Sequence, residues 1–60
     1  MVYQFKNATI LVIDDMQPML ALTASLLKIF GFDNVLLAHN AAEGFQKFLE
    51  HNPDLVITDW

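Results

Sequence analysis

Hydrophobic residues form three short runs along the 60-residue chain: TILVI at 9–13, NVLLA at 34–38 and LVIT at 55–58. The first run is β-branched and apolar without alternating with polar residues, which is typical of a strand buried on both faces of a parallel sheet. The other two runs are short, mostly apolar strand candidates bounded by polar residues. The pattern therefore predicts three strands.

Between the first two runs, apolar residues recur at helical spacing from about Pro18 to Phe30. The apolar positions are Met19, Leu22, Leu26, Ile29 and Phe30. Pro18 suits the first turn of a helix, and Gly31 suits a left-handed residue at its end. These signals predict the first helix.

A second helix is predicted between the second and third runs. Asn40 followed by Glu43 three residues later matches a capping box. Gly44 weakens the helix, and Pro53 favours an extended Asn52 and so ends it. The predicted apolar stripe consists of Ala41, Phe45, Phe48 and Leu49, and the predicted water-facing side consists of Glu43, Gln46, Lys47 and Glu50.

Strand, helix, strand, helix, strand amounts to two successive βαβ units, for which right-handed crossovers are the rule. The expected fold is α/β, the first half of a doubly wound sheet. We favour the parallel strand order 2-1-3 over 1-2-3. In that order the carboxylates that follow strands one and three meet at the topological switch point, where such sheets place their sites.

Composition narrows the function classes. Hydrophobic residues make up 55% of the chain and charged residues 17%, which excludes disorder. No cysteine is present, so disulfides and thiolate metal sites are excluded. The net charge of −4 argues against direct nucleic-acid binding by this segment. The sequence lacks the roughly 20 consecutive apolar residues that span a bilayer and has no signal-peptide layout, so we expect a cytoplasmic protein without a membrane segment.

Three aspartates carry the candidate chemistry. Asp14 and Asp15 follow the first strand, and Asp59 follows the third. Neighbouring strands lie about 4.8 Å apart, so the three carboxylates would crowd one pocket and repel one another. A divalent cation with oxygen ligands, Mg²⁺ or Mn²⁺, would relieve the repulsion, and a carboxylate can attack phosphorus. The alternative for the aspartate pair is a helix cap or a solvated turn.

Three segments together resemble the first half of a CheY-like receiver domain of a two-component response regulator, which has a flavodoxin-like fold. They are ILVIDD at 10–15, LLKIFGF at 26–32 and PDLVITDW at 53–60. The spacing between Asp15 and Asp59 is also that of the family. On this resemblance, residues 1–60 are expected to form a partial receiver domain, truncated after the third strand.

The resemblance implies a role for each aspartate. Asp59 would be the phosphoacceptor and a metal ligand, Asp15 a direct Mg²⁺ ligand, and Asp14 a ligand or a water-mediated partner. A sensor histidine kinase, a phosphotransfer protein or a small phosphodonor would supply the phosphoryl group, and the domain would be regulatory rather than an enzyme. Family receivers also use a Thr or Ser after the fourth strand and a Lys after the fifth. The 60 residues do not include these, so we expect them to lack the switch.

The alternative function is a non-phosphorylated interaction or assembly module built on half a receiver fold. The third strand would have a free edge, so we expect self-association through this edge or by exchange of elements between copies. Leu20 is predicted to be a core residue rather than part of a docking surface. We expect His39 and His51 to be surface residues in a loop or at a helix end. Trp60 is either a fluorescence reporter of metal binding or a frayed terminal residue.

Overall fold

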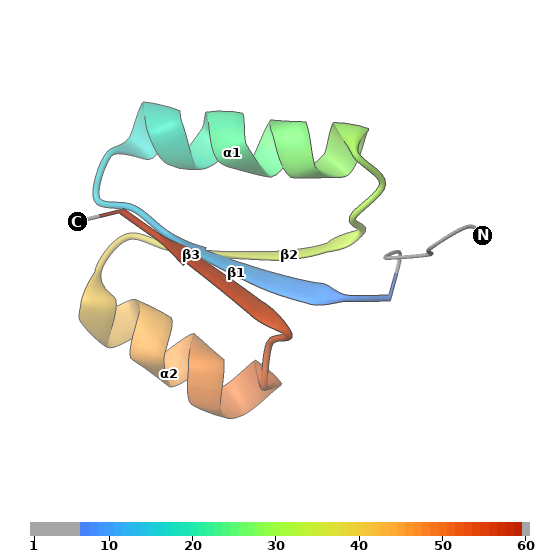
Figure 1. The fold of residues 1–60 in the computed structure, drawn as a ribbon. Coiled ribbons are helices and arrows are strands. Elements are labelled where there is room, and N and C mark those ends of the chain that lie inside the picture. The colour runs from blue at the N-terminus through green and yellow to red at the C-terminus, as the bar shows by residue number, and fades with distance from the viewer. Residues whose placement is uncertain (1–6, 60) are drawn as a thin grey trace.

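The computed structural model describes residues 7–59. In this part of the chain, strands and helices alternate (Figure 1). The elements are β1 (Thr9–Ile13), α1 (Gln17–Ile29), β2 (Asn34–Ala38), α2 (Ala41–His51) and β3 (Leu55–Thr58). The predicted order of elements is confirmed, and the three strands coincide with the three apolar runs.

The strands form one parallel sheet in the order β2-β1-β3, which confirms the predicted order. At the carboxyl end of the sheet, Ile13 of β1 pairs with Ala38 of β2 on one side and with Thr58 of β3 on the other. α1 covers one face of the sheet and α2 covers the opposite face (Figure 1). The sheet is therefore doubly wound from its first two crossovers.

The central strand β1 supplies most of the core. Ile10, Leu11 and Val12 are almost completely buried. Ile10 and Val12 pack with Leu20 of α1, which exposes only 2% of its surface. Burying an aliphatic side chain of this size contributes about 1.5–3 kcal/mol to stability, so each of these residues makes a large contribution to the stability of the fold. Leu20 is thus a core residue, as predicted.

α1 begins without a side-chain cap of its own. Met16 occupies the N-cap position, and its N–H donates instead to Asp14 Oδ1 at 2.9 Å. Pro18 lies in the first turn, where an N–H would have no helical partner. At the other end, Gly31 has a φ of +100°, the left-handed conformation that the sequence predicts for it.

Asparagines terminate α2 at both ends. Asn40 Oδ1 accepts the N–H of Glu43 at 2.8 Å, so the asparagine half of the predicted capping box is present. Asn52 ends the helix in the left-handed conformation, with a φ of 53° and its N–H donating to the carbonyl of Phe48 at 2.9 Å. The prediction of an extended Asn52 was wrong, because asparagine tolerates the left-handed region that closes a helix end.

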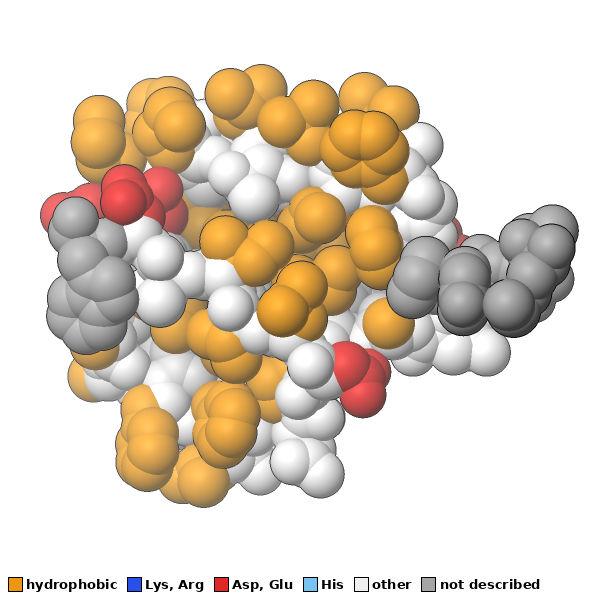
Figure 2. Space-filling view, viewed as in Figure 1, with side chains coloured by type: hydrophobic (Ala, Val, Ile, Leu, Met, Phe, Trp, Pro, Cys, Tyr) orange, Lys and Arg blue, Asp and Glu red, His pale blue; other side chains and the backbone are white. Residues whose placement is uncertain are grey.

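The predicted apolar stripes of both helices lie largely outside the core. The exposed large hydrophobic residues of α1 and its flanks are Met16, Met19, Leu22, Leu26, Ile29 and Phe30, and those of α2 are Phe45, Phe48 and Leu49. Figure 2 shows hydrophobic side chains spread over both helices and the sheet on one face of the molecule. Strands about 4.8 Å apart make a three-stranded sheet scarcely wider than one helix, so most of each stripe has nothing to cover it.

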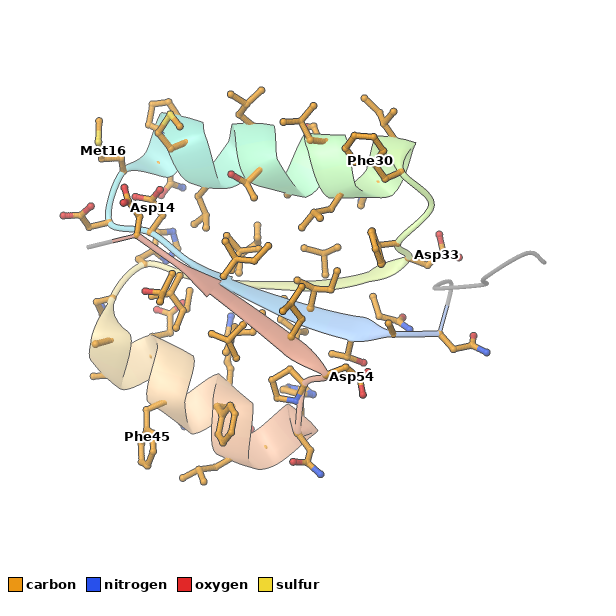
Figure 3. The ribbon with its side chains drawn as sticks, in the orientation of Figure 1. Asp14, Met16, Phe30, Asp33, Phe45 and Asp54 are labelled. Carbon is orange, nitrogen blue, oxygen red and sulfur yellow. The ribbon has the colours of Figure 1, made fainter. Side chains whose placement is uncertain are left out.

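The side of α2 that faces the sheet differs from the one that the sequence predicts. The residue of α2 that is buried is Gly44, which faces Ile13 of β1. Glu43 and Lys47, predicted to face water, are only partly exposed, and Lys47 Nζ donates to the carbonyl of Leu37 in β2. α2 therefore approaches the sheet with its glycine and its polar flank, while Phe45 projects away from the sheet (Figure 3).

Asp54 fixes the start of β3 against the start of β1. Its N–H donates to the carbonyl of Thr9 at 2.8 Å, and its Oδ2 accepts the N–H of Thr9, also at 2.8 Å. Asp54 and Asp14 lie at opposite ends of the sheet (Figure 3). The Asp54 carboxylate therefore accepts a backbone hydrogen bond and lies far from the carboxyl edge of the sheet.

Candidate functional site at the carboxyl edge of the sheet

Backbone hydrogen bonds hold two aspartates at the ends of neighbouring strands. Asp14 follows β1 and Asp59 follows β3, directly after the paired residues Ile13 and Thr58. The N–H of Asp59 donates to the carbonyl of Ile13 at 3.2 Å, and the N–H of Asp14 donates to the carbonyl of Ala38 at 3.1 Å. Both residues are thereby anchored at one edge of the sheet.

The three aspartates differ in exposure. Asp14 exposes only 7% of its surface, and its Oδ1 is oriented by the hydrogen bond from the N–H of Met16. Asp15 and Asp59 are exposed. The site therefore combines one fixed, buried carboxylate with two that solvent or a partner molecule can reach.

All three aspartates line one open groove of about 760 Å³. The groove lies on the α2 side of the sheet. Its apolar lining residues are Leu11, Ile13, Ala41, Gly44, Phe45, Phe48 and Val56, and its uncharged or titratable polar ones are His39, Asn40 and Thr58. Three aspartates along a largely apolar groove are thus the chemical character of this site.

The carboxylates of the groove can be compared with the ligands that Mg²⁺ requires. Within residues 7–59, no three or more His, Asp or Glu side chains gather into a group that could hold a metal ion. Mg²⁺, however, keeps several waters and is usually bound through only one or two carboxylates. One or two carboxylates from among Asp14, Asp15 and Asp59 would suit that mode, so the predicted Mg²⁺ site stays a prediction with chemically suitable residues.

The sequence did not single out His39 as a groove residue. It is exposed, as predicted, but it also lines the groove with the three aspartates. A signal was present, because His39 directly follows β2, whose carboxyl end reaches the same edge as those of β1 and β3. His51 is exposed at the far end of α2, and Trp60 lies outside the described residues.

Two ion pairs that share the carboxylate of Glu43 lie beside the groove, near the start of α2. His39 Nδ1 lies 3.4 Å from Glu43 Oε1, and Lys47 Nζ lies 3.6 Å from the same oxygen. Desolvation raises the pKa of Glu43, but the hydrogen bond and charge of His39 and the charge of Lys47 outweigh it and lower this pKa below its ordinary value. His39 and Lys47 therefore extend the range over which Glu43 stays ionised toward lower pH.

Together, the fold and the site define a class of protein. A parallel sheet in the order β2-β1-β3 with one helix on each face is the first half of a flavodoxin-like, doubly wound fold. Its acidic groove lies at the switch point between β1 and β3, where this class of fold places its functional sites. Neither helix in residues 7–59 is long and apolar enough to cross a membrane.

Comparison with known proteins identifies the family within this class. The chain is 40% identical over 50 residues to the chemotaxis protein CheY of Bacillus subtilis (strain 168), a match that covers 83% of the chain. It spans 42% of the length of that relative. No family model matches the chain, and no solved structure matches it. The chain belongs to the CheY-like receiver family, as its sequence motifs predict, and so to the response regulators of two-component systems.

Proposed function

We propose that Asp59 is the phosphoacceptor of this receiver and takes a phosphoryl group from a histidine kinase or a phosphotransfer protein in a Mg²⁺-dependent reaction in the cytoplasm. The observation that carries the proposal is the position of Asp59. It is exposed, held by its N–H to the carbonyl of Ile13, and placed in one groove with Asp14 and Asp15. The relation to CheY supports the same role.

The chemistry is a direct displacement at phosphorus. A carboxylate oxygen of Asp59 forms the new O–P bond, while the bond from phosphorus to the donor's imidazole nitrogen breaks, and that nitrogen keeps the bonding electron pair. The product is an acyl phosphate on Asp59. Because Asp59 is exposed, a donor histidine on another protein can reach it.

Asp14 and Asp15 would hold the Mg²⁺ ion. When bound, such an ion neutralises charge on the transferring phosphoryl group. Asp14 suits the task because its side chain is buried and oriented by the N–H of Met16, so it loses little conformational freedom on binding. Asp15, on the next residue and exposed, is free to turn toward the cation.

The test is incubation with Mg²⁺ and acetyl phosphate, followed by intact-mass measurement. We expect the wild type to gain one phosphoryl group and Asp59→Asn to gain none. Asp54→Asn is the matched control, because Asp54 is an aspartate at the opposite end of the same strand and is engaged with Thr9. An adduct that persists in Asp59→Asn, or an unmodified wild type, would contradict the proposal.

A second candidate function is an interaction or assembly module. It is favoured by β3, which in the described part of the chain pairs with β1 alone and leaves its other edge without a strand partner. Leu55 and Val56 of this strand are exposed, and Phe45 and Phe48 of α2 flank the same groove. Such an edge is a template for pairing with another chain, so self-association belongs to this proposal.

A further inference from the structure

The two outer strands of the sheet differ in how their edges are protected. Within residues 7–59, β2 and β3 flank the central β1, so each has one side without a strand partner. Both helices run close to β1 and β2, whereas neither runs close to β3. An edge strand presents backbone N–H and C=O groups with which a strand of another chain can pair. The edges of β2 and β3 are therefore the two places at which a second copy could extend the sheet.

Lys47 of α2 occupies the edge of β2. The N–H of Asp14 donates to the carbonyl of Ala38, so this carbonyl points toward β1. Successive carbonyls of an extended strand point to opposite sides, and the carbonyl of Leu37 therefore points away from β1, to the outer side of β2. Lys47 Nζ donates a hydrogen bond to this outward carbonyl. An acceptor that an added strand would need is thus already bonded.

Glu43 helps to hold Lys47 in this position. Its Oε1 lies 3.6 Å from Lys47 Nζ, four residues earlier on α2. The ammonium group thus lies between a carboxylate of its own helix and a carbonyl of β2. A strand that paired with β2 would have to displace this group and bring its own backbone against a positive charge. Lysine side chains are a common means of blocking an edge strand in this way.

The edge of β3 has no such block. The strand contains no charged residue, and Leu55, Val56 and Thr58 are exposed. The N–H of Asp59 donates to the carbonyl of Ile13, so the N–H of Thr58, one residue earlier, points away from β1 and toward the outer side of β3. β3 therefore offers a second copy both backbone groups for pairing and apolar side chains for burial.

We propose that Lys47 closes the β2 edge to strand addition, so that a second copy of this chain pairs at β3 alone and assembly stops at a dimer. The inference rests on the second candidate function, since it requires association through strand edges. Two β3 edges that join about a two-fold axis use each other up, and the outer strands of the dimer are then the two copies of β2. Without the lysine, these outer strands accept further copies.

Sedimentation velocity over a range of concentrations tests the inference. We expect the wild type to reach the mass of a dimer and no more, and Lys47→Met to form assemblies larger than a dimer that grow with concentration. Methionine keeps the length of the side chain but cannot donate to the carbonyl of Leu37. Lys47→Arg keeps a charged donor and should stop at the dimer. Lys28→Met is the matched control, because Lys28 is an exposed lysine in the last turn of α1, and it should also stop at the dimer.

Val56→Lys separates the two edges, because it places a charge on β3. Alone it should stay monomeric, whereas Val56→Lys combined with Lys47→Met should form dimers through β2. Circular dichroism checks that each variant keeps its helices and strands. A wild type that grows beyond a dimer, or a double variant that stays monomeric, overturns the role of Lys47. A wild type that is monomeric at every concentration, beside a double variant that dimerises, rules out association through β3 while the block at β2 stands.

Discussion

Gly44 is the residue at which α2 comes closest to the sheet. A Cβ atom placed there would lie 2.8 Å from Ile13 Cγ1 and closer still to Ile13 Cδ1. From the sequence, Gly44 is only a residue that weakens a helix by about 1 kcal/mol relative to alanine. In the structure, its missing side chain is what allows α2 to lie against β1.

Gly44→Ala is therefore expected to destabilise the protein, although alanine favours the helix. Overpacking of this kind costs about 1–3 kcal/mol, and the gain in helix propensity offsets part of it. The free energy of unfolding should be measured by urea denaturation. The cost should be smaller in an Ile13→Val background, which removes the closest atom of Ile13. A stabilising Gly44→Ala would show that the contact with Ile13 does not limit the packing.

The lowered pKa of Glu43 predicts a pH dependence of stability. Because Glu43 releases its proton more readily in the folded state than in the unfolded state, it stabilises the fold above its unfolded pKa. This contribution is lost as the pH falls through the lower, folded pKa. The difference in unfolding free energy between wild type and Glu43→Gln should therefore be present near neutral pH and vanish in acid.

Chemical denaturation at several pH values measures this difference. The control is Glu50→Gln, because Glu50 is an exposed glutamate on the same helix and takes no part in the ion pairs that join Glu43 to His39 and Lys47. We expect a small effect, since Glu43 is a surface carboxylate and solvent screens its ion pairs. An unchanged difference between neutral and acidic pH would contradict the role assigned to His39 and Lys47 in holding Glu43 ionised.

At the scale of elements, local signals in the sequence were sufficient wherever a single residue type satisfies a backbone group. Asn40 at the start of α2 and Gly31 after α1 behave as their types predict. At Asn52 two preferences conflict, because the proline at the next position favours an extended residue, whereas closing the helix requires the left-handed conformation that asparagine tolerates. Where two local preferences compete at one residue, the packing of the whole turn selects between them.

The cap of α2 gives a prediction at this scale. Asn40→Ala removes the acceptor for the N–H of Glu43 and should lower the free energy of unfolding by about 1 kcal/mol. Asn40→Asp keeps an oxygen at this position and should preserve most of the stability. Thermal or urea denaturation compares the three proteins. Equal losses in both variants would mean that the side-chain amide, rather than the accepting oxygen, is what α2 needs at its start.

At the scale of the whole molecule, the main consequence of the fold is unpaired apolar surface on both faces of a narrow sheet. β3 has a free edge in the described part of the chain, and apolar side chains of β3 and α2 lie beside it. A second apolar surface lies along α1, on the opposite face of the sheet. Exposed surfaces of this kind favour association, and mutations on each surface can show which of the two mediates it.

We expect sedimentation velocity to show concentration-dependent self-association of the wild type. Val56→Lys, which places a charge on the exposed part of β3, should shift the protein toward monomer. Ile29→Lys, which places the same charge on the exposed face of α1, should leave the association unchanged. The reverse pattern would assign the contact to α1, and a wild type that stays monomeric at high concentration would rule out self-association through either surface.

The sequence by itself determined the three strands, the order of elements and the three aspartates that follow β1 and β3. These depend on local residue patterns and on the rule that parallel strands bring their carboxyl ends to one edge. It also carried the motifs of the receiver family, which the relation to CheY confirms. The roles of Asp14, Asp15 and Asp59 in binding Mg²⁺ and accepting phosphate stay predictions.

Only the tertiary structure decided which side of each helix meets the sheet. Apolar spacing placed Phe45 and Leu26 on the predicted apolar stripes, yet both are exposed, whereas Gly44 makes the close contact with β1. It also brought His39 into the groove with the aspartates. The physical reason is that helix orientation and groove lining depend on distances between elements far apart in sequence, and no local pattern of residues encodes those distances.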